Sequence, residues 1–488
     1  MWFNSLSIFI LAALICWPLT LLSQRIGMRL CIYSAAASSR HIHNRPVPRL
    51  GGAAVFVSFL VTIGVAFFAK DLLSVPRTPG QSLLPVVFCG ATLIWLLGLL
   101  DDVWHMRASY KLIIQVLVAA GVYSLGFQIR FISFPILGIL DIGDYSVVFT
   151  VLWIVGAINA VNLIDGIDGL CSGVVLCCLL GIFTMATIFG TESGMVVCSA
   201  LIGSVLMFFV FNFSPASVFL GDSGSYFLGF MVAVLPIFTA AESSSPGVFH
   251  IAFIFFLIVP FLDTVLTVVR RFIMGIPMAT PDRGHLHHNL LDRKYTHKKI
   301  TITVSLISII FVIAGITTAI GGHVQSILAI LAAMAASCFL LHLCGITSLK
   351  ALTVRQESHT TKAVLLKEHA PALFQEIIGA ADWTRTQEIL DGFSRSTNMC
   401  AMSITCRKND TDDTIWKWQS EATTPSRRQP QLCRTYEVFH DDLCFRFYFR
   451  WDSEYSRIQN GTDGLLELIS KTIWKPCHEK FRQMEMET

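Results

Sequence analysis

The stretch NAVNLIDGIDGL (Asn159–Leu170) separates two strongly apolar runs, and it decides how the fold is interpreted. Its polar side chains recur at a spacing of three, at Asn159, Asn162, Asp165 and Asp168. On a continuous helix this spacing places neighbouring pairs on one face, whereas Gly166 and Gly169 favour a broken helix or loop from about Asp165 onward. Irregular backbone at membrane depth is tolerated only where it lines a cavity or is buried in protein. We therefore predict a polar site here, with a plain turn as the alternative.

Composition places the chain among integral membrane proteins. Of its 488 residues, 54% are hydrophobic and 14% charged, and the mean hydropathy is +0.63. A formal net charge of +3 gives no support for a nucleic-acid partner. The 14 cysteines include no CxxC pair, which argues against a zinc ribbon.

Apolar runs long enough to cross a bilayer fill the first two thirds of the chain. Eleven spans are predicted: 3–22, 51–69, 82–100, 110–126, 146–161, 170–189, 195–212, 223–241, 247–269, 299–320 and 323–344. After Lys350 the sequence becomes polar, so residues 1–345 are expected to form an all-α polytopic membrane domain and 350–488 a small soluble α+β domain. In the latter, LCFRFYFRW (443–451) alternates as a strand does, and 461–475 has the pattern of an amphipathic helix.

Lys and Arg in the short loops set the expected orientation. They concentrate in the loops after spans 1 and 9, so the N-terminus is predicted outside and the C-terminal domain in the cytoplasm. Five polar clusters then share the cytoplasmic face: HIHNRPVPRLGG (41–52), LLDD (99–102), NAVNLIDGIDGL (159–170), FLGDSGSYFLG (219–229) and PDRGHLHH (281–288). We expect a single cytoplasmic site to collect them.

Carboxylates end one of these spans and open another. Asp101 and Asp102 are suited to a divalent cation or to proton transfer, with a solvated helix end near Arg107 and Lys111 as the alternative. Asp222, in GDSGS, could simply cap its helix. The same glycine-rich start, however, favours phosphate binding at a helix N-terminus.

Cationic and imidazole side chains complete the set. His285, His287 and His288 have poor metal spacing, but with Arg283 they suit a diphosphate. Arg49 lies in a proline-stiffened basic segment. For both clusters, a merely positive cytoplasmic loop is the alternative. Together, hard oxygen ligands, phosphate grips and an apolar surround suit phosphoryl transfer between a soluble nucleotide and a lipid phosphate.

At these residues the sequence resembles the polyprenyl-phosphate N-acetylhexosamine-1-phosphate transferases, glycosyltransferase family 4. The resemblance covers about residues 1–345, with five motifs in family order, and is strongest to the undecaprenyl-phosphate N-acetylglucosamine-1-phosphate transferase branch. One departure is SAAASSRHIHNRPVPRLGG (34–52), which lacks an Asp-x-Pro-like stretch common in the family.

The resemblance implies a reaction and a set of roles. A sugar 1-phosphate would pass from a UDP-sugar to undecaprenyl phosphate, with release of UMP, by direct attack of the lipid phosphate or through a covalent aspartyl intermediate; we favour direct attack. Asp222 and Asn162 would bind Mg²⁺, for which Mn²⁺ could substitute, and Asp101, Asp102 and Asp165 would be catalytic. Substrate would contact Asn159, Asp168, Arg49, Arg283, His285, His287 and His288.

The resemblance also implies a setting, the bacterial inner membrane, and a purpose, the start of a cell-surface polysaccharide such as O-antigen. The sugar is expected to be N-acetylglucosamine, with another UDP-N-acetylhexosamine such as a 6-deoxy sugar as the nearest alternative. An ion-coupled transporter would need inverted repeats and mid-membrane polar groups, neither of which the sequence indicates. Residues 350–488 are expected to bind a protein partner or to regulate, and a homodimer is left open.

Overall fold

The structure is a computed structural model, and its chain forms two compact units, Met1–Thr347 and Ser348–Thr488. In the first unit it describes residues 2–30, 32–34, 47–68, 83–104, 106–242, 248–273 and 285–343. In the second it describes 372–373, 375–377, 380, 382–397, 399, 401–408, 411–419, 431–440, 443–452 and short stretches between 466 and 484.

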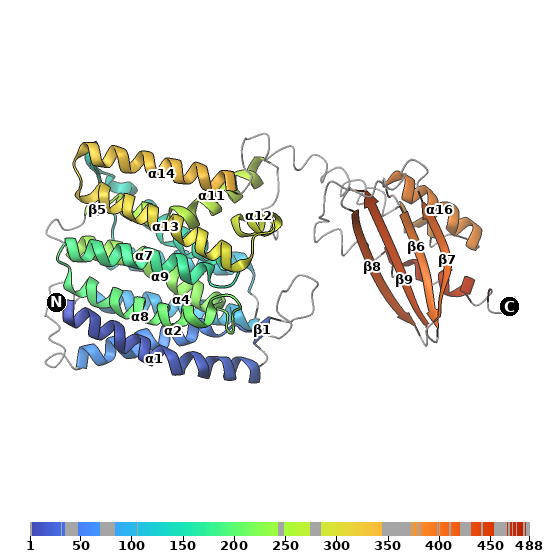
Figure 1. Cartoon of the computed structure of the whole chain (residues 1–488), viewed down its shortest axis with the longest axis horizontal. Coiled ribbons are helices and arrows are strands. Elements are labelled where there is room, and N and C mark those ends of the chain that lie inside the picture. The colour runs from blue at the N-terminus through green and yellow to red at the C-terminus, as the bar shows by residue number, and fades with distance from the viewer. Residues whose placement is uncertain are drawn as a thin grey trace. The chain divides into compact units, whose positions relative to one another are not determined.

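Nine helices in the described part of the chain are long and apolar enough to cross a membrane. They are α1 (Trp2–Arg29), α2 (Gly51–Phe68), α4 (Leu84–Trp104), α6 (Ser146–Ile164), α7 (Leu170–Ile188), α8 (Glu192–Asn212), α9 (Gly221–Glu242), α13 (His297–Ile320) and α14 (His323–Leu343) (Figure 1). The other two predicted spans contain shorter helices. Residues 110–126 correspond to α5 (Ala108–Ser124), and 247–269 to α10 (Ala252–Phe256) and α11 (Ile258–Ile273). The chain is a multi-pass membrane protein.

Helix α9 forms the core of the bundle. Every side chain from Ser223 to Ala240 is buried, and the helix packs against α2, α4, α6 and α7. Its approach to α6 requires Gly229, because a Cβ atom there would lie 2.7 Å from the Cα of Ile158. Helix α14 is the opposite case, with Leu328 and Met334 about 60% exposed, so it presents an apolar surface suited to lipid.

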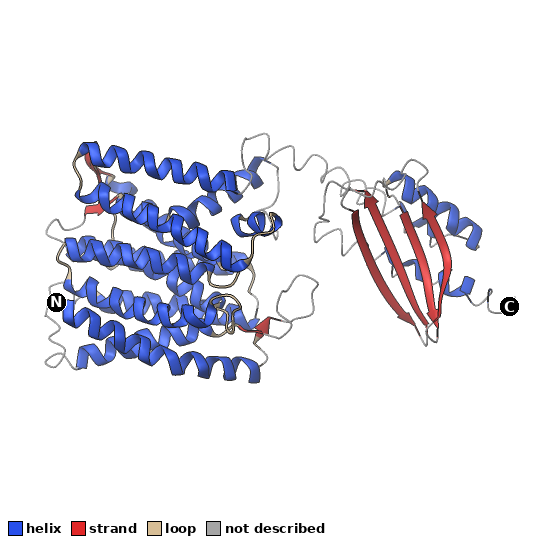
Figure 2. Ribbon diagram, viewed as in Figure 1, coloured by secondary structure: helices blue, strands red, loops and turns tan. Residues whose placement is uncertain are grey.

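Two small sheets accompany the helices, and the all-α prediction did not include them. Strands β1 (Tyr33–Ser34) and β2 (Val47–Pro48) pair antiparallel. Strand β3 (Phe131–Phe134) lies between β4 (Gly138–Asp141), which is antiparallel to it, and β5 (Val248–His250), which is parallel. The two sheets lie at opposite ends of the bundle (Figure 2).

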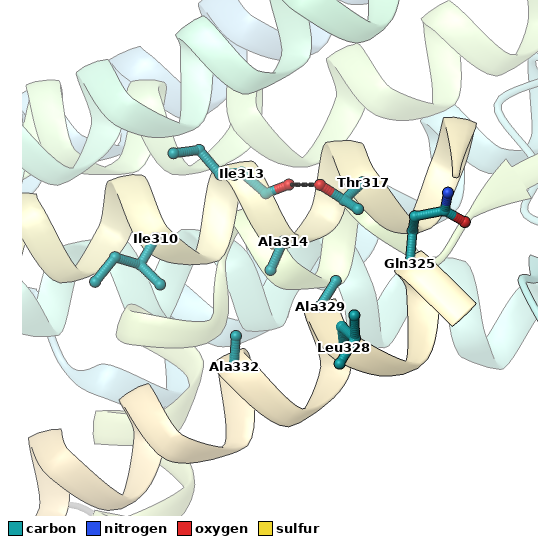
Figure 3. Close-up of a pocket in the computed structure, with 8 residues that line it drawn as sticks. All are labelled: Ile310, Ile313, Ala314, Thr317, Gln325, Leu328, Ala329 and Ala332. Atoms are coloured by element: carbon teal, nitrogen blue, oxygen red, sulfur yellow. Dashed lines mark hydrogen bonds between the residues drawn. The ribbon is translucent and has the colours of Figure 1, made fainter. Parts of the chain in front are cut away.

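A groove of about 330 Å³ lies between α13 and α14 (Figure 3). It is lined by Ile310, Ile313, Ala314, Thr317, Gln325, Leu328, Ala329 and Ala332. The Thr317 hydroxyl donates to the Ile313 carbonyl at 2.8 Å, so it is already satisfied within its own helix. The groove is therefore mainly an aliphatic crevice, and it lies in the second half of α13, away from the polar clusters.

The C-terminal unit contains a four-stranded antiparallel sheet. The strands are β6 (Ala401–Lys408), β7 (Thr411–Gln419), β8 (Gln431–His440) and β9 (Leu443–Asp452), in the order β7-β6-β9-β8. The strand predicted at 443–451 is confirmed: Leu443, Phe445, Phe447 and Phe449 alternate inward and are buried. They share a core with Leu390 and Phe393 of α16 (Trp383–Ser396), so sheet and helix are packed as an α+β unit.

Candidate active site

The end of α4 meets the start of α9 through one carboxylate. Asp102 is buried, and its Oδ1 and Oδ2 accept hydrogen bonds from the backbone N–H groups of Asp222 and Ser223 at 2.8 and 2.9 Å. The first N–H groups of a helix have no partner within that helix, so Asp102 caps α9 from a different helix. Both carboxylate oxygens of Asp102 are therefore occupied by backbone donors.

Glycines allow this close approach. Gly221 has φ +76°, and a Cβ atom there would lie 2.3 Å from the Arg49 carbonyl oxygen and 2.8 Å from Oδ2 of Asp102. A Cβ atom on Gly52 would lie 2.2 Å from the backbone nitrogen of Gly224. Because no side chain fits at these contacts, the glycines bring the backbones of α2 and α9 together around the carboxylates.

Asp101 is also buried, but its charge is compensated. Its Oδ2 accepts from the Tyr226 hydroxyl at 3.0 Å and forms an ion pair with Lys111, and its Oδ1 accepts from the backbone N–H of Met106 at 2.9 Å. The alternative of a freely solvated helix end does not apply to a carboxylate with 2% exposure. Lys111 and Tyr226 tie Asp101 to both α5 and α9.

The side chain of Asp222 points toward α6. Its Oδ1 accepts from the Asn162 amide at 2.8 Å, and the same amide donates to the Ser225 hydroxyl at 2.9 Å. With its nitrogen used in this way, Asn162 keeps its side-chain oxygen for another partner. The sequence had grouped Asp222 and Asn162, and the structure brings them into direct contact.

Asp165 follows α6 and, with Asp222 and Asn162, forms the acidic cluster of the site. It is half-buried, and its backbone N–H donates to the Asn162 carbonyl at 3.1 Å. Burial first, and then the charges of Asp222 and Asp102, raise the pKa of its carboxyl to about 8, against the opposing charge of Arg49. The cluster therefore carries more negative charge than its protein neighbours neutralise.

Oxygen ligands for a cation could come from this cluster. No group of three or more His, Cys, Asp or Glu side chains in the described ranges could hold a metal by itself. Mg²⁺, however, is commonly held by one or two carboxylates together with substrate phosphates and water. Asp222 and the Asn162 oxygen fit that requirement, and a cation would also relieve the charge repulsion that, after burial, raises the pKa of Asp165.

Asp168 and Asn159 are held by protein groups. The Asp168 carboxylate accepts from the Ala216 N–H at 3.1 Å and lies 3.5 Å from Nδ1 of His297. The Asn159 amide donates to the Gln115 side chain at 2.6 Å, which joins α6 to α5. These contacts give both residues a structural role, and their predicted substrate contacts stay predictions.

The histidines gather beside the acidic cluster. His285 and His287 are buried, with parallel rings 6.0 Å apart, and His288 lies 4.3 Å from His287. The short helix α12 (Leu286–Asp292) carries the last two. A Cβ atom on Gly166 would lie 2.2 Å from Nε2 of His287, so this ring packs directly on the turn that follows α6.

The arrangement of these rings affects their charge. Burial lowers the pKa of His287 well below its usual range, and the neighbouring imidazoles of His288, His285 and His297 lower it further. His287 is therefore neutral near pH 7. Arg49 is exposed, whereas Arg283 lies outside the described residues, so its predicted role stays a prediction.

One further carboxylate belongs to this end of the bundle. Asp263 of α11 is buried, and it accepts from the Leu286 N–H at 2.7 Å and contacts Nδ1 of His285 at 3.1 Å. Sequence reasoning missed it, although a single Asp inside the apolar run 247–269 was a usable signal. Tyr226 and Gln115 were missed because the sequence does not show that they contact Asp101 and Asn159.

Known proteins resemble the chain over this region. The family model described as glycosyl transferase family 4 matches residues 84–240. A "Probable undecaprenyl-phosphate N-acetylglucosaminyl 1-phosphate transferase" of Bacillus subtilis is 34% identical over 310 residues, covering 63% of this chain and 83% of the relative. A "Decaprenyl-phosphate N-acetylglucosaminephosphotransferase" of Mycobacterium tuberculosis is 30% identical, covering 59% and 75%. An "Undecaprenyl-phosphate alpha-N-acetylglucosaminyl 1-phosphate transferase" of Escherichia coli is 25% identical, covering 57% and 74%.

Proposed function

The chain belongs to glycosyl transferase family 4, and on that premise we propose that it transfers N-acetylglucosamine 1-phosphate from a UDP-sugar to undecaprenyl phosphate. The products are undecaprenyl diphospho-N-acetylglucosamine and UMP. The relatives named above carry this transfer to a polyprenyl phosphate in their names. The observation that carries the proposal is the acidic cluster of Asp222, Asn162 and Asp165 beside the histidines at one end of a membrane bundle.

Mg²⁺ is the cation proposed for the acidic cluster, with Mn²⁺ as a substitute. Asp222 and Asn162 would hold it, because one is a carboxylate and the amide oxygen of the other has no hydrogen-bond partner among the described residues. A bound Mg²⁺ would offset the negative charge of the diphosphate. Asp165, next to both residues, would contribute a further oxygen once its proton is lost.

In the proposed reaction an oxygen of the lipid phosphate attacks the β-phosphorus of the donor. A new phosphorus–oxygen bond forms there, the bond from the β-phosphorus to the bridging oxygen breaks, and UMP leaves with that oxygen. Asp102 holds the start of α9, so it fixes the backbone from which Asp222 projects. Asp101 positions Lys111, whose ammonium group can attract the anionic acceptor phosphate.

Donor recognition is proposed for the basic and imidazole groups. His285, His287 and His288 lie beside the turn containing Asp165, where they can donate to a diphosphate. Arg49 is exposed next to the Gly221 turn and supplies a cation, and Arg283 is proposed for the same purpose. Asp168 and Asn159 would act at the nucleotide through the segments that they hold together.

The proposed setting is the bacterial inner membrane, with the N-terminus outside and the site in the cytoplasm. Support comes from the Lys and Arg residues of the loops after α1 and α11, since cytoplasmic loops are enriched in these residues. The product would start a cell-surface polysaccharide such as O-antigen. For residues 348–488 we propose a regulatory or partner-binding function.

The experiment is UMP release by purified protein supplied with undecaprenyl phosphate, Mg²⁺ and a panel of UDP-sugars. We expect turnover with UDP-N-acetylglucosamine and little with the corresponding 6-deoxy donor. Preference for the 6-deoxy donor would keep the reaction but replace the sugar. Silence across the panel from folded protein would refute the proposed reaction.

A further inference from the structure

Asp263 is a carboxylate that the proposed reaction does not use. It lies in the apolar helix α11 with 2% exposure, and both of its oxygens face the start of α12. Oδ1 accepts from the Leu286 backbone N–H at 2.7 Å, and Oδ2 lies 3.1 Å from Nδ1 of His285. Burying a carboxylate is costly unless it is paired, so these contacts explain how the charge is accommodated. They also constrain His285.

The contact with the Leu286 N–H bears on which group donates in the contact between Asp263 and His285. A backbone N–H can only donate, so one Asp263 oxygen is committed to it as an acceptor. In the carboxylate form the other oxygen is an acceptor too, so it pairs with a hydrogen on Nδ1 of His285, which the Thr267 hydroxyl also approaches at 3.4 Å. Among the described residues, Nε2 on the other side of the imidazole ring has no hydrogen-bond partner, so it is available to a ligand.

The surroundings of His285 connect it to the acidic cluster. Its ring is parallel to that of His287, with an angle of 4° between the planes. Nδ1 of His287 is buried and has no hydrogen-bond partner among the described residues, and Nε2 of that ring packs on Gly166. His285 thus belongs to a stack that ends on the turn containing Asp165.

We infer that Asp263 is a positioning residue, which holds His285 protonated on Nδ1 and so directs Nε2 toward the diphosphate of the donor. The inference rests on the proposed function, because the UDP-sugar is the ligand assigned to Nε2. A carboxylate on one nitrogen of an imidazole sets which nitrogen carries the hydrogen. It also accommodates a hydrogen on both nitrogens, the form that donates a charge-assisted hydrogen bond from Nε2 to phosphate.

The substitution Asp263→Asn tests this directly. The Leu286 N–H still needs an acceptor, so the Asn oxygen stays there and the Asn amide nitrogen faces His285. The amide donates to Nδ1, and the hydrogen of the neutral ring moves to Nε2. In full-length protein labelled with ¹⁵N-histidine in bilayers, we expect the His285 signal, identified by its loss in His285→Gln, to change tautomer.

The matched control is Thr264→Val in the same helix. The Thr264 hydroxyl donates to the Pro260 carbonyl at 2.9 Å and is not among the contacts of His285. We expect the His285 signal to be unchanged in this variant. If His285 kept its hydrogen on Nδ1 in Asp263→Asn, the inference would be wrong.

A double-mutant cycle on UMP release tests the consequence. Asp263→Asn should lower kcat/KM for the UDP-sugar by about tenfold, mainly through KM, because one hydrogen bond loses its charge. In a His285→Gln background the same change should have no further effect. Multiplied losses would overturn the inference. A wild-type chain that releases no UMP would refute the proposed reaction, whereas the tautomer measurement would still decide the Asp263–His285 relationship.

Discussion

Asp102 and Asp222 meet at 2.8 Å, but through the backbone N–H of Asp222 and not through its carboxyl group. Two carboxylates that sequence reasoning assigned to one chemical site therefore have different surroundings. Asp102 is occupied by the start of α9, whereas the Asp222 carboxylate accepts from the Asn162 amide. This division leads to separate expectations for the two positions.

Asp102→Asn should destabilise the protein more than Asp222→Asn. An Asn side chain offers one acceptor where two backbone N–H groups need partners, and leaving a buried donor unpaired costs about 1–3 kcal/mol. Asp222→Asn loses no backbone contact, so it should keep its thermal midpoint and lose UMP release. Thermal unfolding in detergent and the UMP assay measure the two effects. Equal midpoints for both variants would contradict the capping function of Asp102.

Gly52→Ala should be destabilising by about 1–3 kcal/mol, as overpacking usually is. The added Cβ would lie 2.2 Å from the backbone nitrogen of Gly224, and neither backbone can give way easily. The matched control is Gly64→Ala in the same helix, where no atom lies within 4 Å of an added Cβ. Thermal midpoints should fall for the first variant and stay near wild type for the second. Indistinguishable variants would show that α2 and α9 are not in close contact.

The pKa of Asp165 predicts how stability depends on pH in protein freed of metal. Its folded-state pKa of about 8 lies above its ordinary value of 3.8, so between these values the folded state binds more protons than the unfolded state. Stability must then fall as pH rises through this window. We expect the thermal midpoint in EDTA to decrease from about pH 5 to pH 8. In Asp165→Asn this decrease should be smaller, and an unchanged slope would show that Asp165 does not carry a raised pKa.

Phe447→Ala tests whether the reaction depends on the C-terminal unit. Phe447 is fully buried in the core of the C-terminal sheet, and truncating such a side chain usually costs 3–5 kcal/mol. The described site residues all lie within Met1–Thr347, so the full-length variant should release UMP at close to the wild-type rate. Increased protease sensitivity of the C-terminal unit would report its unfolding. Loss of turnover in a variant whose C-terminal unit has unfolded would show that the reaction depends on this unit.

The sequence indicated the polar groups at this end of the bundle best where each one follows or opens an apolar run. Asp101, Asp222 and Asp165 are of this kind, because a helix end is visible in the hydrophobic pattern. What could not be predicted are the partners across helices. The capping of α9 by Asp102 and the contact of Asp263 with His285 depend on how helices far apart in the sequence pack.

The C-terminal unit shows the same limit differently. The alternation of Leu443, Phe445, Phe447 and Phe449 predicts one strand, and that strand is present. Two of the pairings join consecutive strands, but β6 also pairs with β9, and local patterns do not encode this pairing between distant segments. The sequence of that unit indicates no catalytic or binding site.

The most direct measurement of the central claim is mass spectrometry of the lipid product. Purified full-length protein would be incubated with undecaprenyl phosphate, UDP-N-acetylglucosamine and Mg²⁺, beside an Asp222→Asn variant with a matching thermal midpoint. We predict undecaprenyl diphospho-N-acetylglucosamine and an equal amount of UMP from the wild-type chain, and neither above background from the variant. A folded wild-type chain that forms no such lipid, or a variant that forms it at the full rate, would contradict the account.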